Sequence, residues 1–305
     1  MVWKKMLVLD LDGTILDSNH NISKRMVNLV QSLKKQLIYV VLATGRSVSD
    51  SYKYYLELDL DTYMLNYNGA LMWNPRQNSV IESRYMWEGK KIINYLYKNQ
   101  KKFEIINIIL SADTKTFLLN NNNSYLTNMM VSEYLDYEYC SFTELMEINN
   151  FQRVIISVPN NNRHQICSLL VDKFKDISIY PWKGKKDIID LSINSVDKWV
   201  NVNRLAKMLG ISNENIVSVG DGSNDYSLIK NSGTGIAMKN GNTELKKVAN
   251  YVSEFTNDED GVFRFFNGNN EVLSFNVNFN QLSNSIDNIT KNDEEFYGKN
   301  SPYTR

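Results

Sequence analysis

Cysteine and net charge are both scarce in this sequence of 305 residues. Its two cysteines, Cys140 and Cys167, are too few for a disulfide framework, so we expect buried free thiols and a reducing compartment, the cytoplasm. The 34 Lys and Arg residues balance the 34 Asp and Glu residues, so the net charge is zero. A neutral chain has no long-range field that attracts nucleic acid or an acidic membrane, and we expect neither as a partner.

Long apolar runs and histidine are also rare. No run approaches the roughly 20 apolar residues that a membrane-spanning helix needs. Residues 1–5 lead straight into a predicted strand, which leaves no room for a signal peptide and supports the cytoplasmic location. The two histidines, His20 and His164, lack the spacing of metal ligands, so we expect them to be structural or exposed.

The sequence does contain an alternation of apolar strands and amphipathic helices. Over the first 85 residues, strands are predicted at 6–11, 38–43 and 63–65, with one helix capped by Ser23 and another over 48–58. Strands that alternate with helices form right-handed βαβ units around a parallel sheet. The start of the chain therefore predicts an α/β fold.

The middle of the chain follows a different pattern. Between residues 86 and 191, helices and short strands point to a separate α+β unit, with strands expected at 105–110, 117–119, 153–158, 177–180 and 188–191. The βα alternation then resumes. We therefore predict a discontinuous α/β domain of residues 1–85 and 192–268, an inserted α+β domain of residues 86–191, and an Asn-rich C-terminal extension of residues 269–305.

Two aspartates stand at the end of the first predicted strand, directly after the apolar run Met6-Leu7-Val8-Leu9. Asp10 and Asp12 are two residues apart on an extended chain, so both carboxylates can address one phosphoryl group, while Gly13 lets the backbone turn close beside it. Asp10 can be the nucleophile that forms an aspartyl phosphate. Asp12 can donate a proton to the leaving alkoxide and later take one from the attacking water. The alternative for this pair alone is a strand end whose aspartates cap a turn.

A second acidic cluster follows the strand predicted at 216–219, in the run Gly220-Asp221-Gly222-Ser223-Asn224-Asp225. Because the carboxyl ends of parallel strands share one edge of a sheet, we expect this cluster to meet the first. Carboxylates crowded in this way repel unless a cation lies between them, and hard oxygen ligands suit Mg²⁺. We expect the carboxylates of Asp10 and Asp221 and the backbone carbonyl of Asp12 to bind the ion.

Further polar residues are candidates for phosphate contacts. The hydroxyl of Thr44 and the neighbouring amide of Gly45 can donate hydrogen bonds to phosphoryl oxygens. The charge of Lys198 can reduce the repulsion between a carboxylate nucleophile and a dianionic substrate. Asn224 can hold a phosphate oxygen or a carboxylate, and Asp225 can complete the metal site through a water or orient Lys198. Taken singly, Thr44 is also typical of a turn and Lys198 of a surface position.

The order of these motifs resembles that of the haloacid dehalogenase superfamily of phosphatases. The motifs on which this resemblance rests are Asp10-Leu11-Asp12-Gly13-Thr14, Ala43-Thr44-Gly45-Arg46, Lys198 before a helix, and residues 220–225. Residues 235–240 and 258–262, with Asn68-Gly69, resemble the Cof-type branch, whose large α/β cap lies between the second and third motifs. The resemblance covers about residues 5–268. It implies a Rossmann-like catalytic core of residues 1–85 and 192–268 and a cap of residues 86–191.

The resemblance also assigns roles to residues of this chain. It implies Asp10 and Asp12 as catalytic residues, with phosphate contacts from Thr44, Gly45, Lys198 and Asn224 and metal ligation at Asp10, Asp12, Asp221 and Asp225. The second aspartate distinguishes the chain from related P-type ATPases, which carry Thr there and keep their phosphoaspartate. A chain with Asp12 is therefore expected to hydrolyse the intermediate and turn over.

The resulting hypothesis is a cytoplasmic, Mg²⁺-dependent phosphatase of small phosphorylated metabolites, such as sugar phosphates or phosphorylated cofactors, acting as a monomer or homodimer. The alternatives are a sugar phosphomutase and a non-catalytic sensor that binds phosphorylated metabolites. Two departures from the branch stand out: Trp199 replaces the usual glycine after the motif lysine, and the Asn-rich tail has no counterpart. Cap residues at 111–113 and 180–186 are candidates for substrate selection; the alternative, a solvated hairpin, is the interpretation that we favour for the aromatic and lysine residues of 180–186.

Overall fold

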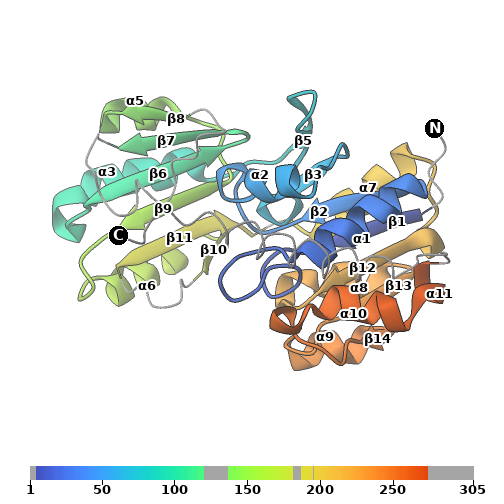
Figure 1. The fold of residues 1–305 in the computed structure, drawn as a ribbon. Helices are drawn as coiled ribbons and strands as arrows, with labels where there is room; N and C mark the ends of the chain where they lie inside the picture. The colour runs from blue at the N-terminus through green and yellow to red at the C-terminus, as the bar shows by residue number, and fades with distance from the viewer. Residues whose placement is uncertain (1–4, 120–136, 181–186, 195, 274–305) are drawn as a thin grey trace, which may run out of the picture. The chain divides into compact units, whose positions relative to one another are not determined.

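The computed structural model describes residues 5–119, 137–180, 187–194 and 196–273 (Figure 1). The described residues form two compact units. Of these residues, the first unit contains 5–42, 57–60 and 203–273, and the second contains 43–56 and the described part of 61–202. Most of the predicted C-terminal extension, residues 274–305, lies outside the described residues.

Five parallel strands pair in the order β14-β13-β12-β1-β2 in the first unit. Their bounds are β1 (Lys5–Leu9), β2 (Ile38–Ala43), β12 (Ile216–Gly220), β13 (Thr234–Ala237) and β14 (Tyr251–Val252). β1, β2 and β12 are almost entirely buried, as is typical of parallel strands covered on both faces. Because Leu9 pairs with Val219, the residues that follow β1 and β12 emerge side by side.

The helices of the first unit are short and amphipathic. They are α1 (Lys24–Lys35), α8 (Tyr226–Asn231), α9 (Thr243–Val248), α10 (Gly261–Gly268) and α11 (Asn270–Leu273), with 3-10 turns η2 (Asn213–Asn215), η3 (Ser223–Asp225) and η4 (Asn257–Glu259). Helix α1 begins at the predicted cap, since the Ser23 side chain accepts a hydrogen bond from the backbone N–H of Met26 at 3.1 Å. The apolar face of α1 is buried and consists of Met26, Leu29, Val30 and Leu33.

The second unit begins with an antiparallel meander. Its strands are β3 (Met64–Asn66), β4 (Leu71–Asn74) and β5 (Ser79–Ser83), and the 3-10 turn η1 (Tyr67–Gly69) connects the first two. The strand predicted at 63–65 is therefore the first strand of an antiparallel hairpin. Helices α2 (Val48–Glu57) and α7 (Lys198–Met208) each have residues in both units.

A separate mixed sheet forms the rest of the second unit, in the order β10-β11-β9-β6-β7-β8 (Figure 1). The strands are β6 (Asn107–Ala112), β7 (Lys115–Leu119), β8 (Tyr137–Cys140), β9 (Arg153–Ser157), β10 (Ile177–Tyr180) and β11 (Ile188–Ile193). All pairs are antiparallel except β7 and β8. Helices α3 (Gly89–Phe103), α5 (Phe142–Glu147) and α6 (Arg163–Lys173) accompany these strands.

The predicted fold class is confirmed: a parallel α/β sheet formed from both ends of the chain, with a separate α+β sheet formed by the intervening residues. The exact domain limits stay a prediction. Strands β5, β8 and β14 were not predicted. Cys140 and Cys167 are free thiols, the first buried and the second partly exposed. Among the residues that the structure describes, no helix has both the length and the apolar character needed to cross a bilayer.

Candidate active site

Asp10 is the first residue after β1, and it is held from two sides. Its backbone N–H donates to the carbonyl of Val219 on β12 at 3.1 Å, which continues the sheet by one residue. The hydroxyl of Thr14 donates to Oδ2 of Asp10 at 3.3 Å. Asp10 is only 4% exposed, whereas Asp12, two residues later, is exposed. The two predicted catalytic aspartates therefore differ sharply in their access to solvent.

Asp225 anchors the second acidic cluster through the backbone. Its Oδ2 accepts hydrogen bonds from the N–H groups of Asp221 at 3.1 Å and Gly222 at 2.9 Å. The side chain of Asp225 is fully buried, while Asp221 is partly exposed. Asn224 is exposed. The turn after β12 is thus fixed in shape by one of its own carboxylates.

The two clusters meet. Asp10, Asp221 and Asp225 each offer a carboxylate oxygen, and the three oxygens lie within 4.8 Å of one another. Three anionic groups at this distance repel unless a cation or a proton intervenes, and an all-oxygen donor set suits a hard divalent cation. The residues present therefore fit a metal site of this kind. The side chain of Asp12 does not belong to the group of three.

Gly13 is required by the way the clusters meet. Its φ of +71° is in the left-handed region, and a Cβ atom at this position would lie 2.2 Å from Oδ2 of Asp221. The backbone carbonyl of Gly13 accepts a hydrogen bond from Nδ2 of Asn240 at 2.7 Å. Asn240 Oδ1 in turn accepts from the backbone N–H of Asn257 at 3.1 Å. Asn240, the last residue of the run at 235–240, thereby supports the loop that carries the first acidic motif.

A histidine that we expected to be structural or exposed is exposed and adjoins this loop. Nδ1 of His20 lies 3.8 Å from Oδ1 of Asp12, and both side chains are more than half exposed. The backbone of His20 has a φ of 62° and donates a hydrogen bond to the carbonyl of Asp17 at 2.9 Å. The sequence carried no signal for this pairing, because the local turn that creates it has no regular period.

Thr44 is in the second unit, where it is buried and firmly held. Its backbone N–H donates to the carbonyl of Leu65 at 2.9 Å, and its own carbonyl accepts from the N–H of Asn68 at 2.9 Å. The Thr44 hydroxyl oxygen accepts a hydrogen bond from the N–H of Arg46 at 3.1 Å. Since that oxygen is the acceptor in this contact, the hydroxyl hydrogen remains available for donation to another group.

Lys198 begins α7 and its side chain is fully buried, which is rare for lysine unless the ammonium group has a partner. Its backbone packs on the turn η1. Gly69 in that turn has a φ of +92°, and a Cβ there would lie 2.9 Å from the carbonyl oxygen of Asp197. The Asn201 side chain also donates to the carbonyl of Gly69. In the sequence Asn68-Gly69 is part of the family signature, and nothing local indicates that it adjoins both Thr44 and Lys198.

The predicted specificity turn at 111–113 is occupied by internal contacts. Oδ2 of Asp113 accepts from the hydroxyl of Tyr85 at 2.8 Å, and Oδ1 accepts from Nε2 of Gln152 at 2.8 Å and from the hydroxyl of Ser83. These contacts use both carboxylate oxygens, and the role of the turn in substrate selection stays a prediction. Of the other candidate segment, residues 181–186 lie outside the described residues.

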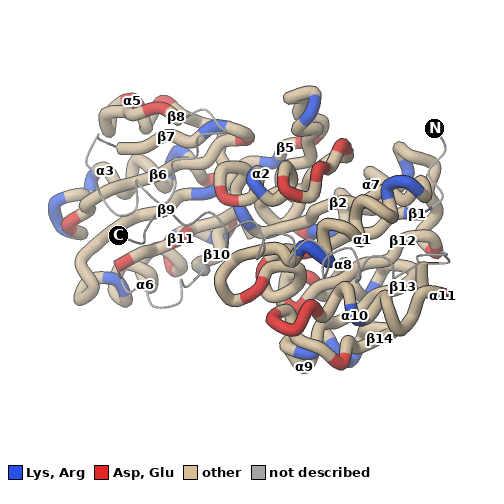
Figure 2. The backbone as a smooth tube through the Cα atoms, in the orientation of Figure 1, with Lys and Arg blue, Asp and Glu red and all other residues tan. Residues whose placement is uncertain are grey.

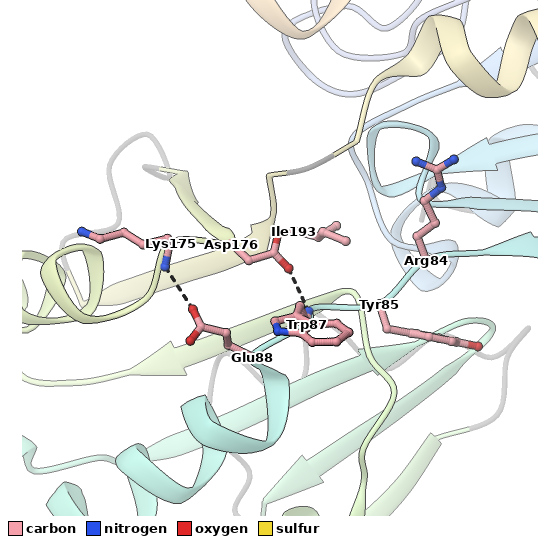
Figure 3. A pocket seen from close by; sticks show the side chains of 7 residues that line it. All are labelled: Arg84, Tyr85, Trp87, Glu88, Lys175, Asp176 and Ile193. Carbon is pink, nitrogen blue, oxygen red and sulfur yellow. Dashed lines mark hydrogen bonds between the residues drawn. The ribbon is translucent and has the colours of Figure 1, made fainter.

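A cavity of 610 Å³ in the second unit contains none of the motif residues (Figure 3). It is lined by Arg84, Tyr85, Trp87, Glu88, Lys175, Asp176 and Ile193. Its two carboxylates are used locally, since Asp176 accepts from the backbone N–H of Trp87 at 2.8 Å and Glu88 from that of Lys175 at 3.1 Å. Figure 2 shows charges of both signs distributed along both units, so the acidic group at the ends of β1 and β12 is a local feature.

Comparisons with known proteins agree with this geometry. The model of the haloacid dehalogenase-like hydrolase family matches residues 7–266. The chain is 27% identical over 269 residues to the 5-amino-6-(5-phospho-D-ribitylamino)uracil phosphatase YitU of Bacillus subtilis, which covers 85% of this chain and 95% of the relative.

Two solved structures show the same fold. A haloacid dehalogenase-like hydrolase from Bacteroides thetaiotaomicron superposes with a TM-score of 0.73 at 24% identity, over 87% of this chain and 99% of that one. The subclass IIB sugar phosphatase BT4131 superposes with a TM-score of 0.66 at 18% identity, over 88% and 99%. The family match, which spans most of the sequence, shows that the chain belongs to the haloacid dehalogenase-like hydrolases, in their Cof-like phosphatase branch.

Proposed function

We propose that this protein is a Mg²⁺-dependent phosphatase that hydrolyses small phosphorylated metabolites through an aspartyl-phosphate intermediate. The observation that carries the proposal is the meeting of the Asp10, Asp221 and Asp225 carboxylates at the ends of two adjacent parallel strands. The relatives support the substrate class, because YitU is a phosphatase of a phosphorylated ribitylamino compound and BT4131 is a sugar phosphatase. Sugar phosphates and phosphorylated cofactor precursors are therefore the substrates to test.

The residues proposed to hold the ion are Asp10, Asp12, Asp221 and Asp225, with Asp12 contributing its backbone carbonyl. Bound there, Mg²⁺ would supply positive charge that offsets the repulsion between the carboxylates and an anionic phosphoryl group. Among the three neighbouring carboxylates, that of Asp225 is the most fixed in position, because two backbone N–H groups donate to one of its oxygens. The Asp221 side chain has the most freedom to move, since it is partly exposed whereas Asp10 and Asp225 are buried.

The proposed reaction has two covalent steps. In the first, a carboxylate oxygen of Asp10 attacks phosphorus while the bond from phosphorus to the substrate oxygen breaks, and Asp12 gives its proton to that oxygen. In the second, Asp12 takes a proton from the water that attacks phosphorus, and the bond to Asp10 breaks to release phosphate. The buried position of Asp10 suits a fixed nucleophile, and the exposure of Asp12 suits proton exchange with solvent.

Thr44, Gly45, Lys198 and Asn224 are proposed to bind the phosphoryl oxygens. The Thr44 hydroxyl accepts from Arg46 and can donate its own hydrogen, and the Lys198 ammonium group supplies positive charge. We also propose that residues 86–191 act as a cap that governs which substrates enter, over a core of residues 1–85 and 192–268, followed by an extension at 269–305. The enzyme is proposed to work in the cytoplasm as a monomer or homodimer.

Replacement of the nucleophile tests the proposed function directly. Asp10→Asn removes the attacking carboxylate, so phosphate release from p-nitrophenyl phosphate and from a panel of sugar phosphates is expected to fall by more than about 1,000-fold. The exposed Glu254→Gln serves as the control and is expected to keep full activity. Equal rates for wild type and Asp10→Asn would contradict the proposal. Binding without release by wild type would favour a sensor, and interconversion of sugar 1- and 6-phosphates would favour a mutase.

The role of Asp12 predicts a trapped intermediate. In Asp12→Asn the water that attacks the aspartyl phosphate lacks its base, while p-nitrophenolate leaves without needing an acid. The variant is therefore expected to accumulate protein that carries one phosphoryl group, detected by intact-mass spectrometry after rapid acid quenching. Wild type and the double variant Asp10→Asn/Asp12→Asn should show none. Phosphorylation of the double variant would place the modification on another residue and exclude this mechanism.

The three neighbouring carboxylates also predict that Mg²⁺ reverses the order of stability of wild type and Asp221→Asn. Without divalent cations, Asp221→Asn relieves repulsion and is expected to raise the free energy of unfolding by about 1 kcal/mol. At a Mg²⁺ concentration of about 100 times Kd, wild type should gain about 2.7 kcal/mol and become the more stable protein. Urea unfolding with EDTA or Mg²⁺ measures both values, with Glu254→Gln as the control. A variant that is less stable than wild type in EDTA and gains as much from Mg²⁺ would rule out this site.

A further inference from the structure

We infer that Arg153, on β9 of the mixed sheet, is a positioning residue that fixes the loop of residues 44–47 through Asp50. The inference rests on the proposed function, because this loop carries the threonine proposed to bind the phosphoryl group. Neither the motif spacing nor the family resemblance singles out Arg153. It is assigned from its contacts within the second unit.

Arg153 forms a buried bridge between two aspartates. Its Nε and Nη2 atoms donate to Oδ1 and Oδ2 of Asp190 on β11, at 2.9 and 2.7 Å. Its Nη1 atom donates to Oδ2 of Asp50 on α2 at 2.7 Å. The side chain of Arg153 is 9% exposed, that of Asp190 4% and that of Asp50 17%. The rigid guanidinium fork therefore joins two strands of the sheet to the first turn of α2.

The charge of Arg153 is secured by its surroundings. Burial by itself would lower the pKa of the guanidinium group, but the carboxylates of Asp190 and Asp50 raise it above its ordinary range. Arginine thus stays protonated at every pH at which the protein is folded. Loss of this cation would leave two largely buried carboxylates without their shared partner, which is far more costly than the loss of an exposed ion pair.

Asp50 transmits this constraint to the loop by two routes. The hydroxyl of Ser47 donates to Oδ2 of Asp50 at 2.6 Å, so the same carboxylate oxygen binds both the loop and Arg153. The guanidinium of Arg46 donates to the backbone carbonyl of Asp50 at 3.1 Å. The backbone N–H of Arg46 in turn donates to the hydroxyl oxygen of Thr44 at 3.1 Å. Every non-covalent step from Arg153 to Thr44 is a hydrogen bond of normal length.

The other side of the loop is held independently of Arg153. The carbonyl of Arg46 accepts hydrogen bonds from the backbone N–H of Tyr67 and from Nδ2 of Asn66, both at 3.1 Å. The N–H of Thr44 donates to Leu65. Because these contacts persist without Arg153, its loss is expected to loosen the loop from one side rather than unfold it. A small displacement of the Thr44 hydroxyl then weakens phosphate binding.

The test compares Arg153→Met with Arg153→Lys and with Arg163→Met. Arg163 is a partly buried arginine on α6 whose Nε donates to the carbonyl of Ile188 at 2.9 Å, so it is a matched control with no contact to the loop. For each protein we would measure the inhibition constant of inorganic phosphate, kcat and KM for p-nitrophenyl phosphate, and the urea midpoint. The inhibition constant is independent of the folded fraction, so a merely structural role would leave it unchanged.

Arg153→Met is expected to raise the inhibition constant of phosphate about 10- to 100-fold and to lower kcat, with partial recovery in Arg153→Lys. Arg163→Met should leave the inhibition constant unchanged even if its urea midpoint falls. In a Thr44→Ala background, Arg153→Met should have little further effect, since both changes act on the same contact. If Arg153→Met fails to fold, Arg153→Met/Asp190→Leu removes the buried cation with its bidentate partner and is expected to raise the constant by a similar factor.

The outcomes separate this inference from the proposed function. A folded Arg153→Met with an inhibition constant within about twofold of wild type overturns the inference when Thr44→Ala still raises that constant strongly. Full additivity of Arg153→Met and Thr44→Ala overturns it as well. If phosphate inhibits none of the proteins and wild type releases no phosphate, the proposed function itself is wrong, and the inference falls with it.

Discussion

Electrostatic repulsion among Asp10, Asp221 and Asp225 is the constraint on which this molecule depends. Folding brings three carboxylate oxygens within 4.8 Å of one another, with Asp10 and Asp225 buried, so the native state concentrates negative charge where water screens it poorly. The register of β1 against β12 enforces this proximity. A divalent cation bound among these carboxylates would turn the same arrangement from a source of instability into a binding site, and in the proposed function this conversion links the fold to phosphate chemistry.

Much of this site could be predicted because it follows from strand ends. Asp10 and Asp221 come directly after apolar runs, and the carboxyl ends of adjacent parallel strands must share an edge. The N-cap of α1 at Ser23 could be predicted equally well from the sequence, since an N-cap depends on residues only three apart. Strand β14 was missed because it consists of two exposed residues at a sheet edge, and β5 because its partly exposed residues show no clear alternation.

The contacts that support the site were not predictable for a different reason. Arg153 and Asp50 are separated by 103 residues, and nothing in the local pattern of either marks a partner at that distance. The same is true of Ser18 and Asp258, which are 240 residues apart. The backbone N–H and the hydroxyl of Ser18 donate hydrogen bonds to the Asp258 carboxylate and thereby lower the pKa of Asp258. Motifs identify groups that can perform chemistry, whereas the residues that hold those groups in place emerge only from tertiary packing.

The most direct test of the central claim is a crystal structure with Mn²⁺ as a stand-in for Mg²⁺, in which anomalous scattering locates the ion. We expect an ion in contact with the carboxylates of Asp10 and Asp221, next to Asp225. An absence of anomalous signal between these residues at saturating Mn²⁺, or carboxylates too far apart to share one ion, would contradict the central claim.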